Sequence, residues 1–427
     1  MTKNFLEQLG KTCVFRAKES SLGAPQALSG VSMDFDLGSS LGLERVVEDD
    51  RDQVRGVELP TRLFAASQTA SGKLGSKRAR PDFLAFALAY FFGNVVSQEV
   101  YDGIYQHTIS ASSSIYLPSF TLVQRRGDSI LTERFAGNLI DGFNLELGES
   151  WVGLSADVKG IGKRETNYFH EIVSAPANST QITLSENSVQ GANAGERLEN
   201  VFRVRAKDSG SNIWSVCRVL SVSAAAPAII NLEQAVGQSQ DPIDFHIDYI
   251  PTEPSWCVFP ASLDESPLRL VDAKLIVDGY FNGSQVLGGE IISSDLLGFS
   301  ISGKNDLEIR KLADGSSEIH ASDAIRKGRE ITIKISERLR HTVRQWQADH
   351  AETDLLSLYL KIRGAEIEPG SGYQFGADII FPQAGIIKAP VSVSGKIYAQ
   401  EGDLLVMDDG TYGGVFVRVW NRASSYL

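Results

Sequence analysis

Hydrophobic and polar positions alternate most regularly between residues 117 and 163. Successive positions differ in character, as expected of strands with one buried face, in the runs 120–125, 130–135, 143–147 and 152–158. The connections are too short for crossover helices, so these four predicted strands must be largely antiparallel. Residues 126–129 are predicted to form the first hairpin turn, and Gly137 a bulge or bend.

One stretch has a helical character instead. Residues 83–92 form an apolar run that is well short of the ~20 residues that a membrane-spanning helix needs. Pro81 suits the first turn of a helix, Asp82 favours the positive end of its dipole, and Gly93 supplies a stop. The sequence therefore predicts a buried helix over residues 81–93, covered on all sides.

The segments before and after this region are less regular. Val31, Met33, Phe35 and Leu37 alternate with polar residues and predict a strand, residues 48–52 predict a solvated loop, and residues 63–74 a weakly extended segment. Between residues 165 and 251, short apolar runs are separated by Gly, Ser, Asn and Asp turns. The runs lie at residues 180–184, 201–205, 213–219 and 245–249. This spacing predicts a small all-β insert of immunoglobulin-like character.

The last segment repeats the order of elements found in the first. A helix near residues 340–349 is followed by a strand at 356–362, a turn at 363–365, Gly376, and strands at 379–384 and 389–399. Gly376 and Gly137 take the same place relative to the preceding strand. We therefore predict an internal duplication of one β fold, each copy with one helix.

Several short motifs, in this order, resemble the tail tube proteins of tailed bacteriophages. The first half contributes residues 105–108 with His107, 117–122 with Pro118, 133–143 with Gly137, and 157–163 with Gly160 and Lys163. The second half contributes residues 279–283, 300–305 and 408–413. The resemblance covers about residues 50–165 and 270–425. The segment between the two matches is a difference from the shorter members of the family, in which it has no counterpart.

This resemblance implies a mainly β protein with a duplicated tail-tube β-sandwich or barrel fold. Its predicted domains are a first unit at residues 1–164, the insert at 165–251 on the outer surface, and a second unit at 252–427. Such a virion protein is made in the host cytoplasm and assembles into stacked rings around DNA and a tape-measure protein. Tail terminator and distal tail proteins are further implied partners, with no membrane and no cofactor. Two units per chain would favour a trimeric ring over a hexamer.

Composition agrees with an assembled protein that does not grip nucleic acid. Hydrophobic content of 42% and charged content of 22% are ordinary for globular chains. The net charge of −12 is unsuited to phosphate binding but fits a lumen that repels DNA phosphates. The cysteines Cys13, Cys217 and Cys257 lack ligand spacing, so we expect reduced thiols. The first residues lack the apolar core of a signal peptide, and none is expected.

The strongest basic cluster is Lys73, Lys77, Arg78 and Arg80. It is either a solvated loop or a contact with an acidic rim of a neighbouring subunit.

The motifs that could indicate catalysis or metal binding are better explained by local structure or lack the required context. Gly38 to Gly42 fits the G-x-S-x-G pattern but lacks a strand-to-helix setting, and residues 160–164 lack the spacing of a phosphate loop. His107 has no second ligand nearby, and residues 408–410 fit a turn better than a calcium site. An enzyme is therefore not expected. A β-sandwich surface-binding module or adhesin is the alternative function.

Overall fold

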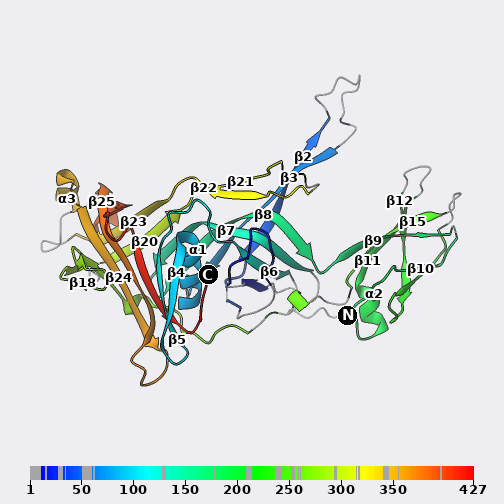
Figure 1. Cartoon of the computed structure of the whole chain (residues 1–427), viewed down its shortest axis with the longest axis horizontal. Coiled ribbons are helices and arrows are strands. Elements are labelled where there is room, and N and C mark those ends of the chain that lie inside the picture. Colours follow the sequence, from blue (N-terminus) through cyan, green and yellow to red (C-terminus); the bar gives the residue numbers. More distant parts are fainter. Residues whose placement is uncertain are drawn as a thin grey trace. The chain divides into compact units, whose positions relative to one another are not determined.

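The structure is a computed structural model, and it divides into two compact units (Figure 1). It describes residues 11–14, 17–26, 32–33, 35–50, 60, 63–126, 131–176, 178–207, 214–236, 242–251, 255–257, 259, 261–292, 296–313, 315, 318–339, 346–353, 355–394 and 397–427. The smaller unit takes in Val123–Arg134 and Glu165–Phe259. The larger unit takes in Lys11–Leu122, Phe135–Arg164 and Pro260–Leu427.

The larger unit is mainly antiparallel β structure. Its strands are β1 (Lys11–Val14), β2 (Ser40–Asp49), β3 (Leu63–Ser76), β4 (Gly93–Tyr101), β5 (Ile104–Ala111), β16 (Ala273–Val277), β17 (Tyr280–Phe281), β18 (Val286–Leu287), β19 (Glu290–Ile291), β20 (Leu296–Lys304), β21 (Leu307–Arg310), β22 (Asp323–Arg326), β23 (Glu330–Arg338), β24 (Leu355–Glu366), β25 (Gln374–Lys388), β26 (Val391–Ser394), β27 (Ile397–Met407) and β28 (Phe416–Asn421). Strands β6 (Phe120–Arg126), β7 (Leu131–Leu147) and β8 (Val152–Thr166) contain residues of both units. Its helices are α1 (Pro81–Phe92) and α3 (Trp346–Glu352), with a 3₁₀ turn at Leu270–Asp272.

Ladders join the early and late parts of the chain within this larger unit. Strand β5 pairs with β28, so that His107 lies opposite Val419. Strand β7 pairs with β20, and β20 continues through β23 to β27. The long strand β25 pairs with β24 on one side, and with β28 and β27 in succession on the other. One hydrophobic core contains residues from both parts of the chain.

Helix α1 lies inside this core. All twelve of its residues are buried, which explains why the sequence offers no polar face. Pro81 occupies the start of the helix, and Gly93 ends it in the left-handed conformation at φ 85°. The predicted helix is thus confirmed, with its last helical residue at Phe92.

The smaller unit is a β-sandwich. Its elements are β9 (Phe169–Ala175), β10 (Gln181–Thr183), α2 (Ala194–Glu199), β11 (Val201–Lys207), β12 (Trp214–Cys217), β13 (Val219–Val222), β14 (Ile229–Leu232), β15 (Ile243–Tyr249) and a 3₁₀ turn at Ser255–Cys257. One sheet has the order β12-β11-β15-β9 and the other β10-β14-β13. Buried side chains of both sheets, among them Phe245 and Ile230, form its own core.

Several predicted elements differ from the structure. The run at 31–37 forms only an isolated bridge at Ser32 among its described residues, and the nearby strand is β2. Residues 131–135 of one predicted strand and 143–147 of the next belong to the single strand β7, because Gly137 adopts a positive φ without ending the strand.

One predicted turn is part of a strand, and a second predicted turn and part of a predicted helix lie largely outside the described residues. Strand β24 continues through residues 363–365, where a turn was predicted, since its pairing with β25 extends to Glu366. The predicted turn at residues 126–129 lies outside the described residues except for Arg126, and so do residues 340–345 of the second helix. The mainly β, antiparallel class is confirmed. The internal duplication and the division into three domains stay predictions.

Candidate assembly surface

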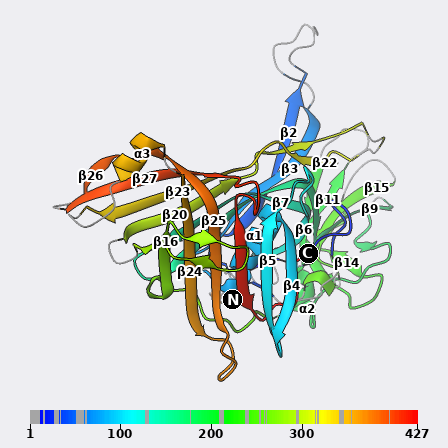
Figure 2. The same cartoon turned by 60° about the vertical axis from the view of Figure 1, so that its left-hand side comes forward.

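A two-stranded arm extends from the larger unit. Strands β2 and β3 pair along their length, and β3 also pairs with β8 from Ala70 to Ser76. In the described part of the chain, no ladder joins residues 46–49 of β2 or residues 63–67 of β3 to a third strand. Figures 1 and 2 both show β2 and β3 reaching away from the rest of their unit. We call these two segments the arm.

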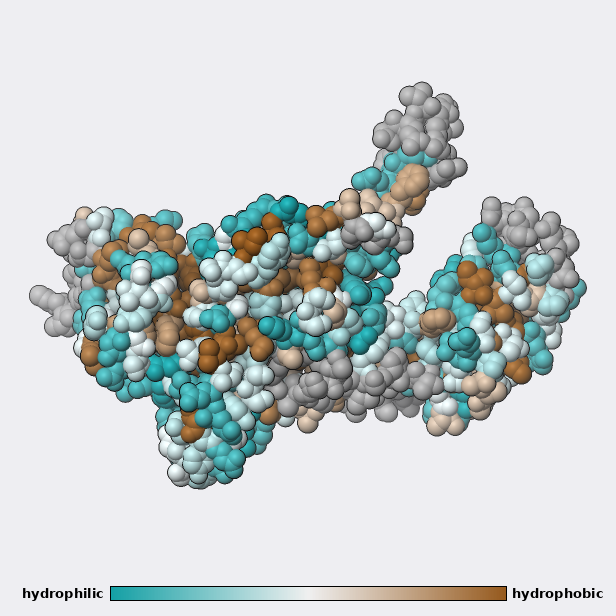
Figure 3. Space-filling view, in the orientation of Figure 1, coloured by the Kyte–Doolittle hydropathy of each residue, from teal (hydrophilic) through white to brown (hydrophobic). Residues whose placement is uncertain are grey.

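The arm exposes apolar side chains. Val46, Val47, Leu63 and Phe64 are 52%, 50%, 73% and 46% exposed. Figure 3 shows hydrophobic surface on the arm beside the grey residues. A two-stranded ribbon is marginal by itself in water, and exposed apolar strands are surfaces on which another chain can pack. The arm is therefore the strongest candidate for a contact between subunits.

The four basic residues at 73–80 have different surroundings. Arg80 precedes α1 and donates to the carbonyl oxygen of Leu263 at 3.3 Å. Arg78 lies over the ring of Trp151, with 5.3 Å between its Cζ and the ring centroid. Lys73 and Lys77 are exposed. A contact with an acidic neighbour therefore stays a prediction for Lys73, Lys77 and Arg78, whereas Arg80 is half-buried.

His107 belongs to a buried hydrogen-bond chain. Its Nε2 donates to Oδ1 of Asn421 at 2.9 Å, because an amide oxygen can only accept, and its Nδ1 lies 2.8 Å from Oγ of Ser97. Asn421 donates to the Tyr426 hydroxyl at 2.6 Å, and that hydroxyl donates to Asp82 at 2.7 Å. The chain ties β5, the carboxyl-terminal residues and the first turn of α1 together.

Gly137 is fixed by a second buried polar group. Its φ is 73°, and a Cβ there would lie 2.6 Å from Ile161. Its amide donates to Glu19, whose carboxylate also accepts from Ser119 at 2.7 Å, Thr121 at 2.9 Å and the amide of Gly23 at 3.0 Å. Glu19 is 5% exposed. No local pattern pointed to Glu19, because three of its four partners, Ser119, Thr121 and Gly137, lie a hundred or more positions away in the sequence.

The other residues of the family-like motifs have structural positions. A Cβ on Gly160 would lie 2.6 Å from Oδ1 of the buried Asn138, and one on Gly376 would lie 2.1 Å from the carbonyl oxygen of Ile362. Lys163 donates to the carbonyl oxygen of Gly23 at 3.0 Å. Pro118 lies near Gly93, where a Cβ would meet its Cδ at 3.6 Å. Gly137 and Gly376 are thus needed for different reasons, a positive φ and a close strand approach.

The motifs that suggested chemistry lack the setting for it. Ser40 begins strand β2 and does not stand between a strand and a helix. Residues 160–163 lie within strand β8. Asp408 and Asp409 accept backbone amides of their own turn, at 2.8 Å from Gly410 and 3.0 Å from Thr411. Cys13, Cys217 and Cys257 form no disulfide with one another.

A groove in the larger unit is lined by residues of β7, β20, β23 and β27. It has a volume of about 520 Å³, and its lining residues include Glu146, Glu149, Glu401 and Asp403, with Lys334. No histidine or cysteine is among its lining residues. The groove therefore has no nucleophile paired with an imidazole base.

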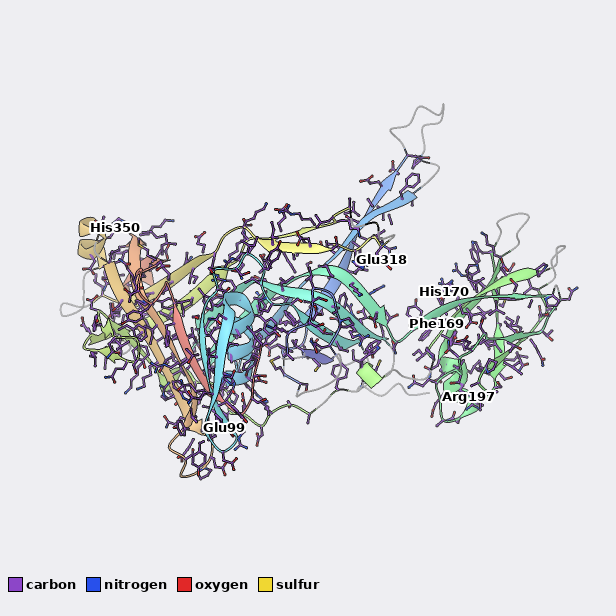
Figure 4. All side chains as sticks on the ribbon, in the orientation of Figure 1. Glu99, Phe169, His170, Arg197, Glu318 and His350 are labelled. Atoms are coloured by element: carbon purple, nitrogen blue, oxygen red, sulfur yellow. The ribbon has the colours of Figure 1, made fainter. Side chains whose placement is uncertain are left out.

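A histidine pair in the smaller unit was missed by the sequence analysis. Nδ1 of His170 lies 2.6 Å from Oδ1 of Asp248, and its Nε2 lies 3.2 Å from Nδ1 of His246 (His170 is labelled in Figure 4). Burial acts to raise the pKa of Asp248, but the hydrogen bonds from His170 and Arg203 outweigh it and lower the pKa. The pKa of His246 is lowered by burial and then by the charges of His170 and Arg205.

The comparisons with known proteins assign this chain to no family. No protein-family model matches the chain, and no curated protein sequence matches it. None of the helices in the described part of the chain combines the length and the apolar character needed to cross a membrane.

Proposed function

We propose that this chain is a structural subunit of a bacteriophage tail tube, which polymerises as stacked rings and conducts DNA during ejection. The observation that carries the proposal is the arm, a β ribbon with Val46, Val47, Leu63 and Phe64 exposed. The order of the family-like motifs and the mainly antiparallel β architecture support it.

The arm favours assembly for a physical reason. Fully burying an exposed apolar side chain of this size stabilises a contact by roughly 1.5–3 kcal/mol, and Val46, Val47 and Phe64, about half exposed, would each contribute a part of that. Leu63 and Phe64 are consecutive in β3 and point to opposite faces, so the ribbon presents apolar side chains on both faces that neighbouring chains would cover. Pairing with a neighbouring chain would also satisfy the ribbon's open backbone groups.

The proposed ring is a trimer in preference to a hexamer. If residues 1–164 and 252–427 are two copies of one unit, three chains supply six copies around the lumen. The net charge of −12 would let DNA and a tape-measure protein slide through instead of adhering. Symmetry averages of negatively stained rings test this point, because a sixfold average would leave one unit per chain.

The assembly proposal is tested by electron microscopy of concentrated protein and by its mass in solution. We expect rings or tubes from the unaltered chain. The double variant Val47→Lys, Phe64→Lys should stay monomeric with an unchanged circular dichroism spectrum, because charge on an exposed ribbon opposes strand contacts.

The matched control is the double variant Val216→Lys, Val271→Lys. These valines are 80% and 79% exposed but lie outside the arm, so the control adds the same charge and should still assemble. A wild-type chain that remains monomeric under all conditions, without a channel-forming species, would contradict the proposal.

The alternative, a surface-binding module or adhesin, is favoured by one observation. The smaller unit exposes Trp214, 40% accessible, with the guanidinium of Arg205 over its ring at 4.4 Å. Aromatic rings flanked by cations are common at binding surfaces. A monomeric protein that binds whole bacterial cells, with binding lost in Trp214→Ala, would favour this function over the tube.

A further inference from the structure

We propose that His170 and His246 form a binding site for a divalent transition-metal ion of the zinc and copper class, on the exposed face of the sheet β12-β11-β15-β9. This site is independent of the proposed assembly. It rests on the position of two imidazole nitrogens, on a carboxylate behind one of them, and on open access from solvent.

The fold brings the two histidines together from neighbouring antiparallel strands. In the register of β9 and β15, His170 lies opposite Asp248, and His246 lies opposite Ile172. The histidines are therefore diagonal neighbours on one face of the sheet. Phe245 and Ile247, which alternate with His246, are fully buried in the core on the other face.

The spacing of the nitrogens fits a shared metal ion. Nε2 of His170 and Nδ1 of His246 are 3.2 Å apart. Two ligands of a tetrahedral zinc ion, each at about 2.0–2.1 Å from the metal, are separated by roughly 3.3 Å. A metal ion would lie to one side of the line that joins the two nitrogens, so both rings turn toward it, and His246 carries its proton on Nε2 when Nδ1 binds the metal.

A carboxylate holds His170 in the form that a metal requires. Oδ1 of Asp248 accepts from Nδ1 of His170 at 2.6 Å, which directs the lone pair of Nε2 toward His246. Oδ2 of Asp248 accepts from Nε of Arg203 at 2.7 Å, so the carboxylate is fixed at both oxygens. Asp248 is 4% exposed. In many metal sites, a carboxylate orients the ligating histidine by the same hydrogen bond.

The other coordination positions are open to water. The His170 side chain is 46% exposed, and in the described part of the chain no group of three or more His, Cys, Asp or Glu side chains is placed to hold a metal. Imidazole nitrogens favour zinc, copper and nickel over magnesium or calcium. Arg205 and Lys207 lie close by over Trp214 and oppose a further cation, so we expect weaker binding than at a site with three or four protein ligands.

The test is calorimetric titration of the full chain, expressed without a histidine tag, with Zn²⁺ and separately with Mg²⁺. We expect one Zn²⁺ per chain and no heat from Mg²⁺. His170→Ala and His246→Ala should each weaken Zn²⁺ binding at least tenfold. His350→Ala is the control, because His350 is an exposed histidine in the larger unit, and it should leave binding unchanged.

A second readout does not depend on any histidine variant. The ring of Trp214 lies 4.6 Å from that of His246, so Cu²⁺ at the site should quench Trp214 fluorescence, and Trp214→Phe should remove that quenching. Asp248→Asn should weaken Zn²⁺ binding by about 10- to 100-fold, as loss of an outer carboxylate does elsewhere. Absence of Zn²⁺ binding, or equal binding in both histidine variants and the wild type, would overturn the proposal.

Discussion

At the scale of single residues, glycines and buried carboxylates fix the path of the long strands. Gly137 lets β7 take a positive φ in mid-strand, and the carboxylate of Glu19 accepts its amide. The carboxylate gathers donors from three separate parts of the chain. A charged acceptor with several donors keeps its place in a core because each of its hydrogen bonds is charge-assisted.

Gly137→Ala should destabilise the larger unit by about 2–4 kcal/mol. The left-handed backbone costs an alanine roughly 1–2 kcal/mol, and the added Cβ would lie 2.6 Å from Ile161, an overpacking that adds to the cost. Gly103→Ala is the control, because Gly103 has φ 65° but nothing within 4 Å of a Cβ, and it should cost only about 1 kcal/mol. Urea unfolding measures both. Equal losses would show that the contact with Ile161 is unimportant.

At the scale of elements, the buried helix α1 depends on a distant arginine. Arg329, between β22 and β23, donates to the carbonyl oxygens of Phe91 and Phe92 at 3.0 and 3.1 Å and to Asn305 at 3.0 Å. A cation at a helix carboxyl terminus also interacts favourably with the dipole. Burial, and then the charge of Arg326, lower the pKa of Arg329, yet an arginine stays protonated near neutral pH.

Arg329→Gln should therefore destabilise the larger unit by about 2–3 kcal/mol, because it removes charged donors from carbonyl groups that the core shields from water. The matched control is Lys327→Gln. Lys327 makes an exposed ion pair with Glu308 at 2.7 Å, and such pairs contribute about 0–1 kcal/mol. Thermal unfolding followed by circular dichroism distinguishes the two variants. A loss at Lys327 as large as that at Arg329 would contradict the capping role.

At the scale of the whole molecule, the described residues form two main cores, one in each unit. One contains α1 and the strands around it, and the other lies between the two sheets of the smaller unit. The larger core draws on residues from both ends of the sequence, whereas the smaller one draws mainly on residues 175–249. Cooperative unfolding follows cores, so the chain should lose its structure in two transitions.

Variants in each core should separate these transitions. Phe245→Ala should destabilise the smaller unit by about 3–5 kcal/mol, and Leu358→Ala the larger unit by about 2–5 kcal/mol, because each removes a fully packed side chain. Phe245 is 0% and Leu358 1% exposed. Differential scanning calorimetry should show that each variant moves a different transition. A single transition lowered by both variants would show that the units unfold together.

The sequence by itself determined the local elements of this protein. Alternation identified most strands, because a strand with one buried face has a period of two, and an apolar run with Pro81 and Gly93 at its ends identified α1. Prediction from the sequence failed where the pairing of strands overrides the local signals for a turn or a strand end. Gly137 does not end β7, and residues 363–365 continue β24, since neighbouring strands supply hydrogen bonds that a turn would lose.

Only the tertiary structure decided which distant residues meet. The pairing of β5 with β28 places His107 beside Asn421, and the pairing of β9 with β15 places His170 beside His246. The exposure of Val47 and Phe64 on the arm also depends on the absence, in the described residues, of a third strand beside them. No local pattern encodes such meetings, because they depend on strand register between segments that the chain brings together only on folding.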